Sequence, residues 1–153
     1  MVNHLFNKNL LRGRIAECIV EQLFKDRGFN IYRFGYEAIL QSFTQANGRL
    51  QRGNNINNMI RQAPDFIIED NGYVNFVEAK FSAEGKYRLK KDYFWKDAFI
   101  LVVSLTEPCF KIAKASDLLN GGRFRPLEQW MSPKFDNKIL SRYCDLVKEY
   151  FSK

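Results

Sequence analysis

The chain has 153 residues, which suits one domain, and its 46% hydrophobic and 27% charged residues are ordinary for a globular protein and argue against disorder. Basic residues outnumber acidic ones by 24 to 17, and the resulting net charge of +7 favours a polyanionic partner over an acidic binding protein. Because no apolar run reaches roughly 18 residues and the start lacks a secretory signal, we expect no membrane partner and a cytoplasmic protein.

The cysteines and the single histidine narrow the possible chemistry. Cys18, Cys109 and Cys144 are odd in number and form no close pair, so we expect reduced thiols that serve as packing residues. His4 lies near the N-terminus, which argues against a histidine-based zinc site or a Ser-His-Asp triad. Any catalysis is therefore expected to use carboxylates, lysines and a metal ion.

The first half of the chain predicts a helix, a strand and an insertion. Apolar residues recur at helical spacing over residues 11–27, and Gly28 is a typical helix stop. A short extended run follows at 29–34. We read residues 36–63 as an insertion, because glycines and an asparagine pair interrupt any regular pattern there. Residues 38–64 contain no acidic residue and three arginines: Arg49, Arg52 and Arg61.

The second half predicts a hairpin, a helix and a buried strand. Two apolar runs, at 65–69 and 73–81, flank Asn71-Gly72, which is the strongest short hairpin signal. A basic stretch at 83–96 is expected to be helical. The almost wholly apolar run at 98–105 is expected to be a strand buried on both faces.

The remaining sequence completes the expected fold. Residues 110–113 predict another short strand, and residues 115–153 a C-terminal helical extension that ends in an amphipathic helix. We therefore predict a single α/β domain over residues 1–153. Its core runs helix, three strands, helix, strand, with a central mixed sheet flanked by helices and an added C-terminal helix.

The hairpin turn predicts which residues of the two strands face each other. A two-residue turn at Asn71-Gly72 places Asp65 opposite Glu78, and Lys80 projects from the same face as Glu78. Two carboxylates about 5 Å apart repel by roughly 3 kcal/mol at an effective dielectric of about 20. Two interpretations follow: a divalent cation binds between the carboxylates, or Asp65, Glu78 and Lys80 form a structural ion cluster.

The first helix supplies one more candidate. At about 100° per residue, Glu17 falls at the border of the apolar arc, whereas Glu21 falls toward solvent and can pair with Lys25 one turn later. If this helix packs on the sheet, Glu17 is the better placed to reach the carboxylate pair. The alternative is that Glu17 is a solvated helix carboxylate.

These residues resemble a known nuclease signature. Pro64-Asp65, followed after twelve residues by Glu78-Ala79-Lys80, resembles the motif of the PD-(D/E)XK nuclease superfamily, and the apolar run at 74–77 resembles its motif strand. The sequence Gly13-Arg14-Ile15-Ala16-Glu17 is similar to the superfamily's N-terminal helix with its glutamate. The resemblance covers about residues 11–105 and is closest in outline to small archaeal Holliday-junction resolvases.

The resemblance implies a restriction-endonuclease-like core and metal-dependent hydrolysis of DNA phosphodiester bonds in repair, recombination or restriction. Asp65, Glu78 and the backbone carbonyl of Ala79 would hold Mg²⁺ or Mn²⁺. Lys80 would orient the attacking water or stabilise charge on the phosphate. Glu17 would bind the metal through water or complete a second site. Because junction and duplex cutting often need two active sites, a homodimer stays an open alternative.

Basic residues beyond the motif are the predicted nucleic-acid contacts. They are Lys86, Arg88, Lys90, Lys91 and Lys96, interleaved with Tyr87, Tyr93 and Trp95, together with Arg49, Arg52 and Arg61 of the insertion. Such residues would neutralise backbone phosphates, although a solvated basic surface would look the same in sequence. Besides a DNA endonuclease, two readings stay open: a nuclease-like fold that binds nucleic acid or a protein without cleaving, and an RNA nuclease or RNA-binding module.

Overall fold

A six-stranded mixed sheet forms the centre of the protein, as the computed structural model shows for residues 4–130 and 134–152. The strands lie in chain order across the sheet: β1 (Asn30–Arg33), β2 (Phe66–Asp70), β3 (Tyr73–Phe81), β4 (Phe99–Val103), β5 (Phe110–Lys114) and β6 (Arg125–Pro126). β3 and β4 are parallel, and all other neighbours are antiparallel. The predicted α/β class, with helices flanking a mixed sheet, is confirmed.

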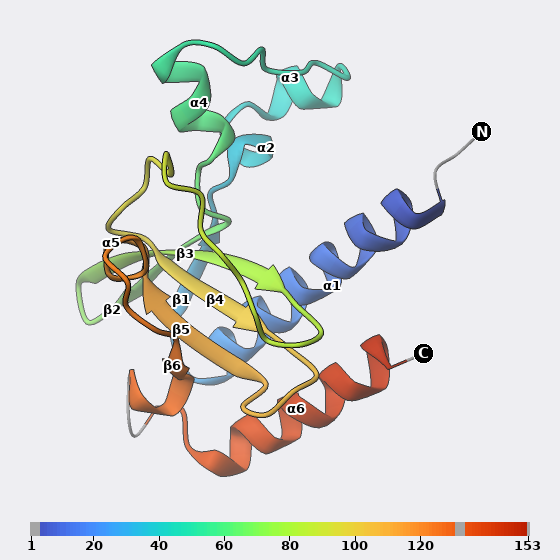
Figure 1. Ribbon diagram of the computed structural model, residues 1–153, viewed down its shortest axis with the longest axis vertical. Helices are drawn as coiled ribbons and strands as arrows, with labels where there is room; N and C mark the ends of the chain where they lie inside the picture. The colour runs from blue at the N-terminus through green and yellow to red at the C-terminus, as the bar shows by residue number, and fades with distance from the viewer. Residues whose placement is uncertain (1–3, 131–133, 153) are drawn as a thin grey trace.

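The two long helices α1 (His4–Asp26) and α6 (Asn137–Phe151) cover one face of this sheet (Figure 1). α1 ends at Asp26, just before the predicted stop at Gly28, which adopts a left-handed φ of 85° that terminates a helix readily. Its stripe of Ala16, Val20 and Leu23 is fully buried against inward-facing strand residues. Asp136 caps α6 by accepting a hydrogen bond from the Ile139 backbone N–H at 2.9 Å.

The opposite face is covered by residues 82–98, which connect β3 to β4, and by α5 (Ala115–Leu119). The prediction of a helix at 83–96 was wrong, because this connection has no regular secondary structure. The Ser82 hydroxyl bonds both the N–H and the C=O of Lys86, and Gly85 has a positive φ of 74°. This local turn competes with a helix, and the aromatic residues beyond it pack on the sheet instead.

Residues 36–61 form an arm that stands away from the sheet (Figure 1). It contains three short helices, α2 (Tyr36–Ile39), α3 (Gln41–Gln45) and α4 (Asn55–Arg61), none of which has a buried residue. The base of the arm is fixed to the 82–98 connection. The Trp95 indole N–H donates to the Met59 carbonyl, and the Phe94 N–H donates to the Gln62 side chain, both at 2.8 Å.

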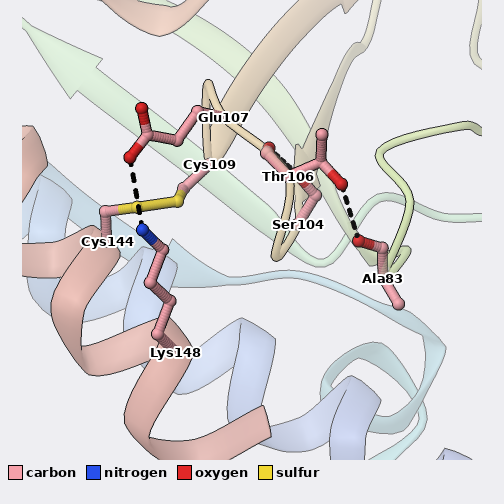
Figure 2. The surroundings of a disulfide bond; sticks show 7 residues. All are labelled: Ala83, Ser104, Thr106, Glu107, Cys109, Cys144 and Lys148. Carbon is pink, nitrogen blue, oxygen red and sulfur yellow. Dashed lines mark hydrogen bonds and ion pairs between the residues drawn. A yellow bond between two sulfur atoms is a disulfide. The ribbon is translucent and has the colours of Figure 1, made fainter. Parts of the chain in front are cut away.

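The prediction of reduced thiols was wrong for two of the three cysteines. Cys109, at the start of β5, and Cys144, on α6, form a disulfide with their Cα atoms 5.6 Å apart (Figure 2). Sequence spacing did not reveal the pair, because 35 residues separate the two positions and only packing of α6 on the sheet brings them together. Cys18 has a free thiol and is exposed rather than packed in the interior.

Within residues 4–130 and 134–152, no helix combines the length and the apolar composition that a membrane crossing requires.

Candidate active site

The β2–β3 hairpin positions the two carboxylates predicted from the sequence. Asn71 and Gly72 both have positive φ values, of 52° and 84°, as a two-residue type I′ turn requires. The predicted register is confirmed, since Asp70 pairs with Tyr73 and Phe66 with Val77. Asp65 immediately precedes β2, and Glu78 follows Val77 on β3, so the two residues lie opposite each other.

Hydrogen bonds hold this carboxylate pair in place. The Asp65 backbone N–H donates to Glu78 Oε2 at 3.2 Å, and the Ala79 N–H donates to Asp65 Oδ2 at 2.9 Å. Each side chain therefore accepts a bond from the other strand's backbone. Lys80 Nζ lies 3.0 Å from Glu78 Oε1 and supplies the nearest positive charge.

α1 brings Glu17 to the same place. Its carboxyl group lines the same clefts as Asp65, and its Oε2 lies 3.7 Å from an Arg33 guanidinium nitrogen. Glu21, one turn further along, is directed toward Lys25 at 3.1 Å and Arg33 at 2.8 Å. The structure thus brings together Glu17, Asp65, Glu78 and Lys80, whereas Glu21 pairs at the rim.

The electrostatics of the group show a shortage of positive charge. Burial, followed by the neighbouring charge of Asp65, raises the pKa of Glu17 to about 8. Burial and then Glu78 raise the pKa of Asp65 to about 7. Burial also raises the pKa of Glu78, although Lys80 opposes that shift. At neutral pH Glu17 and, in part, Asp65 therefore retain protons that ordinary surface carboxyls have lost.

Two adjoining clefts open from these carboxyl groups. One, of about 510 Å³, is lined by Arg12, Lys80 and Ala83, and the other, of about 560 Å³, by Arg14, Arg33 and Arg61 together with Glu37. Both clefts share a floor that lies between α1 and the hairpin. The shared floor residues are Asn9, Gly13, Glu17, Asp65 and Glu78. Acidic groups on the floor and arginines on the walls suit a substrate that carries negative charge and a cation that bridges it to the floor.

The predicted nucleic-acid contacts occupy three different positions. Arg61 lines the larger cleft. Arg49 and Arg52 are exposed on the arm. The lysines and the arginine of the 82–98 connection, namely Lys86, Arg88, Lys90, Lys91 and Lys96, are all exposed and lie outside the linings of both clefts.

Sequence reasoning missed Arg12, Arg14 and Arg33, which line the clefts. Helical spacing in the sequence could have indicated two of these residues, Arg12 and Arg14. Asn9, Gly13 and Glu17 are four residues apart, so the residues beside them on α1 border the same face. Arg33 gave no comparable signal, since its role depends on β1 lying against α1.

The oxygen atoms at the floor of the clefts are of the chemical type that hard divalent cations prefer as ligands. Among the described residues, no three acidic, histidine or cysteine side chains are placed closely enough to form a metal site as they stand. The oxygen donors at the floor are the side chains of Asp65 and Glu78, next to the backbone of Ala79, with Glu17 beyond them. Mg²⁺ prefers one or two carboxylates together with water and substrate phosphate, so three protein side chains are not required.

No protein-family model matches this chain, and a search of curated proteins finds no match either.

Proposed function

We propose that the protein is a metal-dependent endonuclease that hydrolyses phosphodiester bonds in DNA, as the PD-(D/E)XK resemblance implies. The observation that carries this proposal is the opposed pair Asp65 and Glu78, with Lys80 3.0 Å from Glu78, at the floor of an arginine-walled cleft. A protein that only binds nucleic acid has no need of half-buried, opposed carboxylates, because like charges across two strands are destabilising.

The raised pKa values support a cation at this floor. Lys80, together with Arg33 whose charge is shared with Glu21, faces three carboxyl groups, so retained protons or added positive charge stabilise the group. We assign Mg²⁺ or Mn²⁺ to Asp65, Glu78 and the Ala79 carbonyl, with Glu17 as a further carboxylate in the same clefts. When bound, such an ion supplies Lewis-acid polarisation of the phosphate and a more acidic water.

The protein's own residues supply the remaining requirements. Lys80 is 39% exposed at its side chain, so its ammonium group can turn from Glu78 toward a phosphate oxygen and stabilise the charge that develops there. Arg14 and Arg61 on the cleft wall suit the flanking phosphates. The exposed cations of the 82–98 connection and the arm extend this basic surface beyond the cleft.

A second candidate function is nucleic-acid binding without cleavage. It is favoured by the exposed cations of the arm and the connection, which lie outside both clefts and need no metal to contact phosphates. This candidate predicts DNA affinity that is independent of Asp65 and Glu78. A homodimer with two such sites would suit junction or duplex cutting.

A cleavage panel tests the proposed function. Linear duplex, flapped, four-way junction and single-stranded DNA, with a matched RNA, are incubated with Mg²⁺, with Mn²⁺ or with EDTA. We expect cleavage of at least one DNA substrate with metal and none with EDTA. Asp65→Ala and Lys80→Ala should each lower the rate by at least about 100-fold while the circular dichroism spectrum stays native.

Arg125→Ala is the matched control, because Arg125 is an exposed cation on β6, at the opposite edge of the sheet from β1. It should cleave like the wild-type protein. Full activity of Asp65→Ala, or cleavage that persists in EDTA, would contradict the proposal. DNA binding without cleavage under every metal condition would favour the second candidate.

A further inference from the structure

Tyr93 carries an unexplained polar group. Of the buried side-chain nitrogen and oxygen atoms in the described part of the chain, the Tyr93 hydroxyl is the one without a hydrogen-bond partner. The residue as a whole is only 8% exposed. A buried hydroxyl without a partner destabilises a fold, so native proteins keep few of them and such a group calls for an explanation.

The position of Tyr93 links this hydroxyl to the carboxylates. Its ring packs in the cluster that contains Ile100 and Val102 of β4. These two residues pair in register with Glu78 and Lys80 of β3. Phe76 packs against the same cluster, and side chains alternate along a strand, so Glu78 and Lys80 project toward the face that Tyr93 occupies.

The surroundings of Tyr93 keep its hydroxyl protonated, so that it is a hydrogen-bond donor without an acceptor. Burial, followed by the neighbouring Glu78 carboxylate, raises the pKa of Tyr93, so the hydroxyl stays protonated at neutral pH. Glu78 accepts one bond from the Asp65 N–H and pairs with Lys80. A carboxylate has about four lone-pair sites, so Glu78 has capacity for a further donor.

We propose that Tyr93 is a positioning residue whose hydroxyl donates a hydrogen bond to the Glu78 carboxylate when the site is loaded. In the free protein Lys80 occupies Glu78 Oε1. Once a phosphate draws Lys80 away, Glu78 needs a new donor to hold its orientation, and Tyr93 supplies it. Such bonds are commonly long in free enzymes and tighten on loading. This inference rests on the proposed function.

Tyr93→Phe separates this role from a structural one, because the two predict opposite results. The variant removes a hydroxyl that bonds nothing in the free protein, so the melting temperature without metal should stay unchanged or rise. The Mg²⁺ dissociation constant, measured by calorimetry with a non-cleavable DNA analogue bound so that a phosphate can draw Lys80 from Glu78, should increase about tenfold, since partners that orient metal ligands have effects of that size. The Mg²⁺ concentration for half-maximal cleavage should rise in parallel, while KM for DNA stays constant.

Tyr143→Phe is the matched control. Its hydroxyl donates to the Asp26 carboxylate at the junction of α6 and α1. This variant should lower the melting temperature and leave Mg²⁺ binding unchanged. A Tyr93→Phe protein that binds Mg²⁺ like the wild type, or that melts well below it, would overturn the role of Tyr93 alone. A wild-type protein that binds no Mg²⁺ would overturn the proposed function together with this inference.

Discussion

Glu17 and Asp65 line the same clefts, and burial together with the neighbouring negative charges raises the pKa of both carboxyl groups. Arg33 lies 3.7 Å from Glu17 but is also engaged by Glu21 at 2.8 Å, so its charge is divided. Lys80 serves Glu78. At neutral pH the carboxyl groups on the floor of the cleft therefore destabilise the folded protein as they ionise, and a bound cation would offset their repulsion.

The stability of the folded protein should therefore decrease as pH rises and these carboxyl groups ionise. Because burial raises the pKa of Glu17 to about 8 and that of Asp65 to about 7, both groups are protonated in the folded protein and ionised in the unfolded one between about pH 4 and those values. Their stabilising contribution is complete below the unfolded pKa values of about 4 and is lost as pH rises through 7 and 8. Without metal, the melting temperature should fall between roughly pH 5 and 8.

Glu17→Gln isolates this effect, since the amide has the same shape and no charge. The variant should flatten the decline and raise the melting temperature at pH 8 by about 2–4 °C for each 1 kcal/mol recovered. Differential scanning calorimetry in EDTA measures both curves. Parallel curves for the two proteins would show that Glu17 ionises normally and would contradict the assigned electrostatics.

At the scale of elements, the hairpin was predictable because its signals are local. Asn71 and Gly72 specify the turn by their φ preferences, and the turn then sets the register that opposes Asp65 and Glu78. The helical period over 11–27 likewise placed α1, which begins earlier than predicted, at His4. These predictions needed no knowledge of distant contacts.

The elements that sequence reasoning missed depend on distant contacts. The 82–98 connection carries helix-compatible residues, but its aromatic side chains pack on β3 and β4, and Ser82 and Gly85 turn the chain first. Parallel strands need a long crossover, and nothing in the sequence required that crossover to be helical. The Cys109–Cys144 bond and the role of Arg33 arise in the same way, from packing between remote segments.

Gly72→Ala tests the turn as the source of register. A side chain at a φ of 84° is strained, and we expect the free energy of unfolding to fall by about 1–2 kcal/mol in urea denaturation. Gly13→Ala is the matched control, because Gly13 lies within α1, where a Cβ would meet no atom within 4 Å. That variant should be neutral or slightly stabilising. Equal destabilisation by both changes would contradict the assigned turn.

At the scale of the whole molecule, the net charge of +7 is distributed unevenly around the site. Residues 38–64, which contain no acidic residue, and the basic 82–98 connection meet where Trp95 and Phe94 bond to the base of the arm. Arg61, at the end of α4, continues this surface into the cleft. The molecule thus presents an acidic floor surrounded by basic walls, an arrangement that attracts a polyanion and a divalent cation together.

Calorimetric titration of the metal-free protein with Mg²⁺ tests this account most directly. At pH 7, in two buffers that differ in ionisation enthalpy, we expect saturable binding with net proton release, because Asp65 and Glu17 have pKa values of about 7 and 8 and must ionise as the cation binds. Asp65→Asn, which keeps an acceptor for the Ala79 N–H, should abolish the saturable heat. Absence of saturable binding to the wild-type protein, or equal binding to Asp65→Asn, would contradict an ion centre at this floor.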